Sequence, residues 1–218
     1  MKKPVICGVI VDGDMAAVKE AAPLVDMYEV RIDLIGSGWR EVAGQLEKPW
    51  IACNRTAGEG GNWQGSEARR KEELLKACEL GASIVDIELG ITNLERLVPI
   101  IKKKAKCLIS FHDMDKTPPI DNLRMIVKRQ LTAGADICKV VTTAREFKDN
   151  LTVLELLAEF PKADIITFAM GDSGLSSRVL SPMLGSGIAY AAVKRGGESA
   201  PGQITVAELY KLYKIVNQ

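Results

Sequence analysis

Short apolar runs alternate with longer amphipathic segments along the chain. The apolar runs are rich in Val and Ile and predict β-strands at residues 5–10, 27–34, 50–55, 84–89, 107–112, 137–142, 164–170 and 187–193. The segments between them carry apolar residues at helical spacing and predict helices at residues 15–24, 38–46, 66–80, 94–103, 120–133, 150–160 and 177–184, with a last helix at 204–216. Strand and helix therefore alternate from one end of the chain to the other.

Start and stop signals support several of these helices. Ser66 can cap the helix that follows it, while Gly81 and Gly134 stand just after two predicted helices, where glycine commonly ends a helix. Thr205 and Glu208 have the spacing of a capping box at the start of the last helix.

Strands that are each followed by a helix predict a compact (β/α)8 TIM barrel of the α/β class. We expect a single catalytic domain over residues 1–218, with no fused second enzyme. The structural alternative is an open doubly wound sheet, but no Gly-x-Gly-x-x-Gly turn follows the first strand.

Charge and cysteine content narrow the choice of partner and compartment. The 29 Lys and Arg against 28 Asp and Glu predict binding neither to nucleic acid nor to a membrane, so we expect a small-molecule partner. The apolar start of the chain, broken by Gly8, is too short for a secretion signal, and the five cysteines form no C-x-x-C pair; both features favour a cytoplasmic protein. With one histidine and no paired cysteines, we expect no metal site.

Two predicted strands carry charges where a barrel interior is usually apolar. Because apolar residues alternate with them and must face the surrounding helices, the inward positions are Glu29, Arg31 and Asp33 on the second strand and Asp86 and Glu88 on the fourth. Buried charges are costly unless they are paired, and Arg31, Arg55 and Lys139 are available as counter-charges. Such a network is either structural or part of an active site.

Lys139 and His112 are the two residues that most strongly indicate chemistry. Lys139 lies in mid-strand among apolar residues; it either extends to the surface or points inward, where desolvation and nearby arginines are expected to lower its pKa and create a neutral amine nucleophile. His112, the only histidine, ends the neighbouring strand. A lone histidine is often structural, but the carboxyl ends of barrel strands form the catalytic face.

Two glycine-containing loops, residues 170–178 and 196–203, follow the last two strands. They are either simple flexible connections, a phosphate site of the kind that many barrels place there, or a carboxylate site held by Arg178.

These motifs together resemble one family along the whole barrel. The matching pieces are Glu29-x-Arg31-x-Asp33, Arg55-Thr56 with Glu59-Gly60-Gly61, Asp86-Ile87-Glu88, Ser110-Phe111-His112-Asp113, Lys139, Met170-Gly171-x-x-Gly174-x-x-Ser177-Arg178 and Ser199-Ala200-Pro201-Gly202-Gln203. In this order they resemble the type I 3-dehydroquinate dehydratases, the Schiff-base class of the shikimate pathway.

The resemblance implies a role for each matching position. Lys139 condenses with the C3 ketone of 3-dehydroquinate, His112 is the general acid/base that takes the C2 proton and helps expel the C1 hydroxyl as water, and Glu59 orients His112. Arg178 holds the substrate carboxylate. The groups that hold the ring hydroxyls and close the site are Glu29, Arg31, Arg55, Ser199 and Gln203. The apolar walls are Met170 and Tyr190.

The activity implied is the elimination of water from 3-dehydroquinate to give 3-dehydroshikimate, a carbon–oxygen lyase step of aromatic amino-acid biosynthesis. No cofactor is implied, because a protonated imine is itself an electron sink, and relatives of this family suggest a homodimer. The alternatives are a class I aldolase acting on a sugar phosphate, against which the segment 199–203 argues, and a non-catalytic barrel that binds a small acid.

Overall fold

The structure, a computed structural model, describes residues 4–216. Eight strands form one sheet in the order β7-β6-β5-β4-β3-β2-β1-β8, and the pairs are parallel. The strands are β1 (Val5–Ile10), β2 (Met27–Arg31), β3 (Trp50–Cys53), β4 (Ile84–Glu88), β5 (Lys106–His112), β6 (Ile137–Thr143), β7 (Ile165–Met170) and β8 (Ile188–Ala192). The sheet curls into a nearly closed barrel, and its two ends meet where the rings of Phe168 on β7 and Tyr190 on β8 lie 6.3 Å apart between centroids. The predicted (β/α)8 barrel is confirmed.

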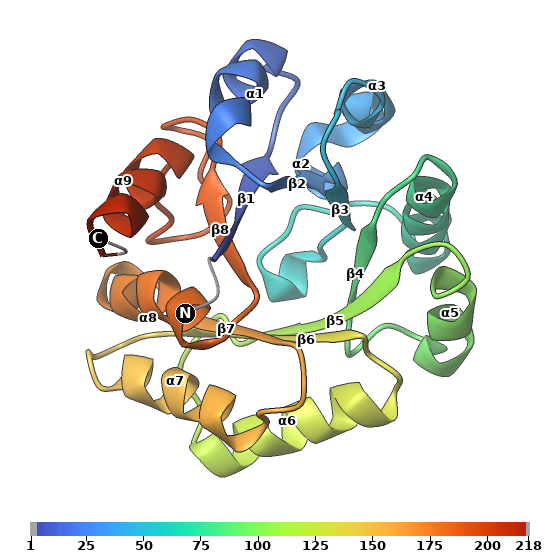
Figure 1. The fold of residues 1–218 in the computed structure, drawn as a ribbon. Coiled ribbons are helices and arrows are strands. Elements are labelled where there is room, and N and C mark those ends of the chain that lie inside the picture. The colour runs from blue at the N-terminus through green and yellow to red at the C-terminus, as the bar shows by residue number, and fades with distance from the viewer. Residues whose placement is uncertain (1–3, 217–218) are drawn as a thin grey trace.

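Helices surround the barrel (Figure 1). They are α1 (Met15–Ala21), α2 (Ile32–Ile35), α3 (Trp39–Gly44), α4 (Glu67–Glu79), α5 (Leu94–Ile101), α6 (Ile120–Thr132), α7 (Asp149–Glu159), α8 (Leu175–Leu180) and α9 (Val206–Val216). Most predicted helices are present within a few residues of the expected bounds. None of the helices in residues 4–216 is long and apolar enough to cross a membrane.

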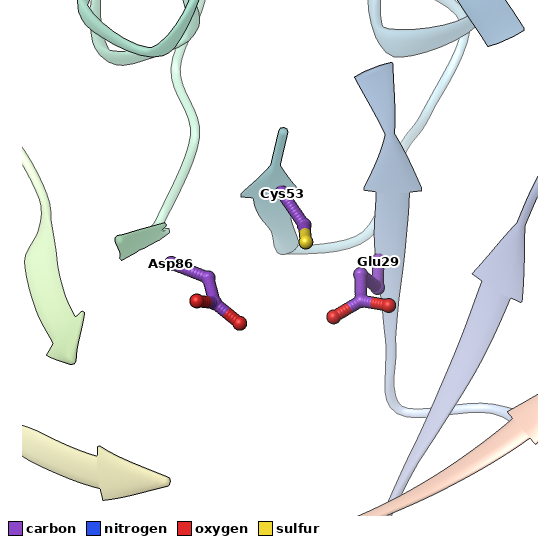
Figure 2. A group of neighbouring side chains, drawn as sticks. All are labelled: Glu29, Cys53 and Asp86. Atoms are coloured by element: carbon purple, nitrogen blue, oxygen red, sulfur yellow. The ribbon is translucent and has the colours of Figure 1, made fainter. Parts of the chain in front are cut away.

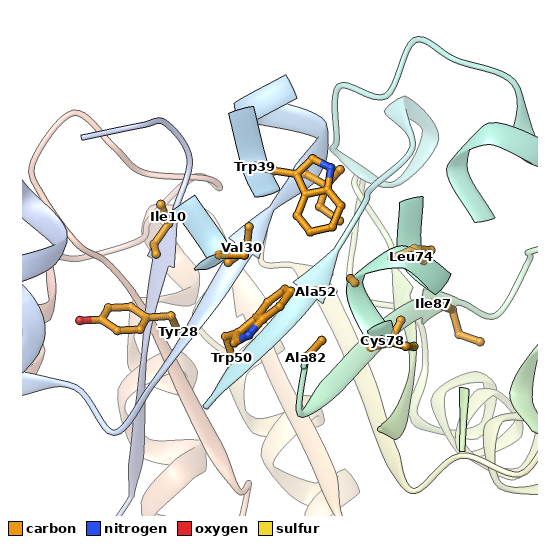
Figure 3. Close-up of a cluster of buried hydrophobic side chains, with 14 of the residues drawn as sticks. Ile10, Tyr28, Val30, Trp39, Trp50, Ala52, Leu74, Cys78, Ala82 and Ile87 are labelled. Carbon is orange, nitrogen blue, oxygen red and sulfur yellow. The ribbon is translucent and has the colours of Figure 1, made fainter. Parts of the chain in front are cut away.

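Apolar side chains form separate layers inside and outside the barrel wall. The interior layer holds alternate strand residues such as Met27, Ile51 and Leu108, while the intervening residues pack outward against the helices. Part of the outer layer is drawn in Figure 3, where Trp39 and Trp50 lie with ring centroids 6.4 Å apart. Each fully buried large apolar side chain contributes roughly 1.5–3 kcal/mol. Strand alternation thus assigns every second residue to the interior, where the site lies.

The predicted caps at the starts of α4 and α9 are confirmed. The Ser66 side chain accepts a hydrogen bond from the backbone N–H of Arg69 at the start of α4. Thr205 and Glu208 form the capping box of α9, in which the Thr205 N–H donates to the Glu208 carboxylate at 2.9 Å and the Glu208 N–H donates to Thr205 Oγ1 at 3.3 Å. All five cysteines are free and buried, so their thiols serve as packing groups.

The prediction for the second strand is wrong at its carboxyl end. The strand stops at Arg31, and residues 32–35 form the short helix α2, so Asp33 is not an inward residue of the strand. The helical turn brings the Asp33 carboxylate back onto the Arg31 guanidinium, with contacts of 3.0 and 2.7 Å. A bidentate pair of this kind compensates the charge of a buried arginine. If the strand continued straight, both side chains would point into the barrel without forming this pair.

Candidate active site

A polar layer crosses the barrel above its apolar floor. Inward residues of four strands supply it: Glu29 on β2, Asp86 on β4, Ser110 on β5 and Lys139 on β6. Ser110 is the register partner of both Glu88 on β4 and Lys139 on β6. Because inward residues at one height converge on the barrel axis, these strands place a lysine and two carboxylates in contact.

Lys139 points inward and is paired with both carboxylates. Its Nζ lies 3.1 Å from Asp86 Oδ2 and 3.4 Å from Glu29 Oε1, and the ring of Tyr190 covers it at 4.2 Å from the centroid. Burial alone would lower the pKa of Lys139, but Asp86 and Glu29 outweigh burial and raise it. The expectation of a lowered pKa is therefore wrong. Arg55 does lower the pKa of Lys139, as expected for a neighbouring arginine, but the two carboxylates have the larger effect.

Asp86 is the centre of a fully bonded network behind the lysine. Its Oδ2 accepts a hydrogen bond from Arg55 at 2.6 Å, and its Oδ1 accepts one from the Ser110 hydroxyl at 2.6 Å. Burial would raise the pKa of Asp86, but the charges of Arg55 and Lys139 hold it well below its usual range. Asp86 therefore remains ionised and fixes the lysine side chain in place.

His112 is paired with Glu59 at the mouth of the barrel. Its Nδ1 lies 2.8 Å from Glu59 Oε2, which also accepts the His112 backbone N–H at 3.1 Å. Burial, followed by the charges of Arg55 and Lys139, lowers the pKa of His112 well below its usual value. Burial also raises the pKa of Glu59 to about 7. A neutral imidazole whose Nδ1–H is held by a carboxylate presents Nε2 as a base.

The segment that carries Glu59 is anchored at both ends. Glu59 ends a 3-10 turn, Ala57–Glu59, that sequence patterning did not predict. Before the turn, the Thr56 N–H donates to Glu88 Oε1 at 2.9 Å; after it, the Asn62 N–H donates to Asp33 Oδ2 at 3.0 Å. Glu88 and Asp33 thus hold Glu59 against His112.

Arg178 is a buried cation without a carboxylate partner among residues 4–216. Its guanidinium lies over the Phe168 ring at 4.4 Å, its terminal nitrogen donates to the Pro201 carbonyl at 3.4 Å, and its Nε has no hydrogen-bond partner. Burial lowers its pKa to about 10, so it stays charged at neutral pH. Such a group is suited to bind an anion from the cavity.

The loop of residues 196–203, which follows β8, lies against Arg178. The Gln203 side-chain oxygen accepts a hydrogen bond from the Ser199 N–H at 2.7 Å, and the Pro201 carbonyl accepts one from the Gly171 N–H at 3.1 Å. Gly202 has φ +71°, and a Cβ there would lie 2.4 Å from the Gly171 carbonyl oxygen. Only glycine permits this close contact between the loops that follow β7 and β8.

One cavity unites the site residues predicted from the sequence. Its wall includes every one of them: Glu29, Arg31, Arg55, Glu59, His112, Lys139, Met170, Arg178, Tyr190, Ser199 and Gln203. Sequence reasoning missed other wall residues, notably Met114 and Phe168. The inward alternation of β7 could have identified Phe168, whereas Met114 lies in a loop and carries no pattern.

Three potential metal-ligand atoms also meet in the polar layer. Glu29, Cys53 and Asp86 point toward one another (Figure 2), and their ligand atoms lie within 4.8 Å of one another. The ammonium of Lys139 contacts both carboxylates and supplies a positive charge at this place. Burial strongly raises the pKa of the Cys53 thiol, which keeps it neutral.

The cavity opens where the carboxyl ends of the strands meet, which places the chain among the (β/α)8-barrel enzymes. A lysine amine in the cavity wall narrows this class to barrels that can form an imine with a carbonyl substrate.

Comparison with known proteins identifies the family. The model described as Type I 3-dehydroquinase matches residues 6–218, and the chain belongs to this family. A 3-dehydroquinate dehydratase from Dehalococcoides mccartyi is 42% identical over 217 residues, covering 100% of this chain and 98% of that protein. Another from Methanosarcina mazei is 32% identical over 231 residues, covering 99% and 96%.

Solved structures agree with this placement. The type I 3-dehydroquinate dehydratase of Clostridium difficile has a TM-score of 0.86 at 28% identity and covers 99% of this chain and 93% of its own. The enzyme of Geobacillus kaustophilus has a TM-score of 0.86 at 26% identity, covering 99% and 92%. The chain is thus a hydro-lyase of the 3-dehydroquinate dehydratase type, for which a Schiff-base mechanism is characteristic.

Proposed function

We propose that this dehydratase converts 3-dehydroquinate to 3-dehydroshikimate in the shikimate pathway, with Lys139 as the residue that forms the imine. The observation that carries the assignment is the position of Lys139: its amine is buried in the barrel, yet it lines the cavity that also contains His112 and Arg178. Other lysines in residues 4–216 that have a described side chain lie outside that wall.

The imine makes the neighbouring carbon acidic. Once Lys139 is bonded to C3, the protonated imine withdraws electrons from C2 more strongly than a ketone does, and loss of a C2 proton forms an enamine. The enamine then expels the C1 hydroxyl. The electron sink is thus the protonated imine that the Lys139 side chain forms with the substrate.

We assign the proton transfers at C2 and C1 to His112, and we assign to Glu59 the role of orienting the His112 ring. The Glu59 carboxylate accepts from both the His112 backbone and Nδ1, which fixes the tautomer that leaves Nε2 free to take a proton. The imidazolium that results can return this proton to the departing C1 oxygen, so that water leaves.

Arg178 is assigned to the substrate carboxylate. The guanidinium is buried, charged and without an anionic partner in the part of the chain that the structure describes, and a carboxylate would compensate it through paired hydrogen bonds. We assign the ring hydroxyls to the polar atoms that line the rest of the wall, contributed by Glu29, Arg31, Arg55, Ser199 and Gln203, and the apolar contacts to Met170 and Tyr190.

A cytoplasmic homodimer is part of the proposal. An apolar groove between α7 and the turn Ser181–Leu184 is lined by Leu154, Leu157 and Leu184, and Leu184 is 60% exposed. An apolar surface of this kind fits an interface between copies of the chain. Light scattering at assay concentrations should give twice the mass of the chain, and a monomer mass would refute the homodimer.

The test of the function is an assay of 3-dehydroquinate conversion, followed by the absorbance of the conjugated product. We expect turnover by the native chain and a loss of roughly 10²–10⁴-fold in His112→Ala, the usual effect of removing a general acid/base. A native chain without turnover would refute the function, and a His112→Ala variant of near-normal turnover would refute the role of His112.

A further inference from the structure

Met114 is a residue of the cavity wall to which the roles above assign nothing. It follows His112 by two positions and is 41% exposed. Its thioether packs on Gly60, the residue after Glu59: a Cβ built on Gly60 would lie 2.7 Å from Met114 Cε and 3.0 Å from Met114 Sδ. Met114 therefore makes a second contact between the two segments that carry Glu59 and His112.

The backbone on the Gly60 side of this contact is held by hydrogen bonds. The Gly60 N–H donates to the Ala57 carbonyl at 3.2 Å, and the Gly61 N–H donates to the Thr56 carbonyl at 2.8 Å. The freedom to move at this contact thus belongs mainly to the flexible side chain of Met114.

Met114 combines exposure to solvent with a place in the cavity wall. The other methionines of residues 4–216 are buried or lie outside that wall: Met15, Met27, Met125, Met170 and Met183. Met125, on α6, is 57% exposed and lies outside the wall. Thioethers that solvent reaches are oxidised to sulfoxides, so Met114 is the methionine of this wall that is open to oxidation.

The thiol in the same wall is protected from such oxidation. Cys53 is buried, and burial strongly raises the pKa of its thiol. Thiols react with peroxides as thiolates, whereas a thioether needs no deprotonation. A peroxide that enters the cavity therefore reacts with Met114 before Cys53.

We propose that Met114 is an oxidation site through which peroxide disrupts the Glu59–His112 pair and lowers turnover. A lone pair of the sulfur attacks one oxygen of hydrogen peroxide, and the O–O bond breaks. The hydroxide that leaves takes the proton of the transferred oxygen and becomes water. The sulfur is oxidised by two electrons to the sulfoxide, and the peroxide is reduced.

The sulfoxide no longer fits against Gly60. The close contact leaves no space for an oxygen on that side of the sulfur, and on any other side the oxygen requires hydrogen bonds from water. The oxidised side chain therefore leaves Gly60, and water reaches the Glu59 carboxylate and competes for the Nδ1–H of His112. The loss of turnover rests on the proposed function, in which His112 is the base.

Peroxide treatment of matched variants tests the site. Untagged native chain, Met114→Leu and Met125→Leu are treated with hydrogen peroxide, sulfoxides are located by peptide mass spectrometry, and turnover of 3-dehydroquinate is compared with the untreated sample of each protein. Native chain and Met125→Leu should lose turnover on the order of 10–10²-fold, in step with oxygen at Met114, because the catalytic pair is displaced. Met114→Leu should keep the turnover that it has before treatment.

The reversal of the damage separates sulfur chemistries. Methionine sulfoxide reductases should restore turnover of the treated native chain, whereas dithiothreitol, which reverses thiol oxidation, should not. Recovery with dithiothreitol, oxygen at Cys53 in step with the loss, or equal loss in Met114→Leu would overturn the proposal.

A measurement on the His112 ring needs neither turnover nor a substitution. His112 is the only histidine of the chain, so ¹⁵N-labelled histidine gives one pair of ring nitrogen signals. Above neutral pH, Nδ1 should carry a proton that exchanges slowly with water, and oxidation at Met114 should speed this exchange. Unchanged exchange in protein oxidised at Met114 would overturn the proposal. Absence of turnover in the untreated native chain would instead refute the proposed function, and the ring measurement would still test Met114.

Discussion

Lys139 and Arg178 are both buried cations in the wall of the same cavity, but their surroundings differ. Lys139 contacts two carboxylates, and these raise its pKa. Arg178 contacts an aromatic face and a carbonyl, and burial lowers its pKa to about 10. The first charge is compensated before substrate arrives, whereas the second is left for the substrate to compensate.

This difference matches what each group has to do in the proposed reaction. A lysine that becomes an imine changes its bonding, so it needs neighbours that stabilise both its ammonium and the protonated imine. An arginine that holds a carboxylate keeps its charge, and a competing carboxylate beside it would occupy its hydrogen bonds. The cost of leaving Arg178 unpaired is thus recovered when substrate binds.

The largest effect is expected when Lys139 is replaced by an apolar residue of similar length. Lys139→Met should abolish turnover and, because it leaves the buried Glu29 without its cation and Asp86 with Arg55 alone, should destabilise the fold by about 3–5 kcal/mol. Urea denaturation measures the free energy of unfolding. A Lys139→Met variant as stable as the native chain would mean that the two carboxylates do not depend on this cation.

The matched change at the second cation should act in the opposite direction on stability. Arg178→Met removes an uncompensated buried charge and should stabilise the free protein by roughly 1–2 kcal/mol. The loss of charged hydrogen bonds to the substrate should raise KM on the order of 10²-fold. Loss of stability in Arg178→Met, measured in the same urea series, would contradict the contrast between the two cations.

A smaller effect is expected from pH, through the carboxylate that orients His112. Burial raises the pKa of Glu59 to about 7. Above this pH the carboxylate accepts the Nδ1–H of His112 and leaves Nε2 as the base; below it, protonated Glu59 donates to Nδ1 and the imidazole carries its proton on Nε2. Turnover should therefore fall roughly tenfold per pH unit below the pKa.

The comparison variant for this profile is Glu59→Gln, whose amide does not titrate. Its turnover should be low and should lack the acid limb that Glu59 produces. Retention of the same acid limb in Glu59→Gln would assign that limb to another group. Circular dichroism across the pH range checks that the fold is unchanged.

The barrel and the inward positions of its strands follow from strand alternation, whereas Glu59, Ser199 and Gln203, which lie outside the strands, are expected only from the family resemblance. An inward position on a parallel strand is decided by its neighbours, so strand alternation predicts that Glu29 and Asp86 point inward, whereas for Lys139 it leaves an extension to the surface open. The last residues of a strand are different, since there the chain leaves the sheet. Strand alternation predicts Asp33 on the strand, but Asp33 belongs to α2, where its carboxylate contacts Arg31.

The pKa of Lys139 could not be predicted because it depends on distances between strands. The sequence shows that arginines and carboxylates share the interior, and each shifts the pKa in its own direction. Only the register of the strands decides that Asp86 and Glu29 lie against the nitrogen while Arg55 binds Asp86. Likewise, the turn that carries Glu59 has no periodic pattern, and its position rests on Glu88 and Asp33.

The central claim is that Lys139 bonds covalently to the substrate while Arg178 only binds it, and borohydride reduction tests this most directly. Native chain and Arg178→Met are each reduced in the presence of saturating 3-dehydroquinate, and their peptides are analysed by mass spectrometry. The account predicts irreversible inactivation and a substrate- or product-derived adduct on Lys139 in both proteins, with a higher substrate concentration needed for Arg178→Met. An adduct on another lysine such as Lys194, or no adduct in the native chain, would contradict it.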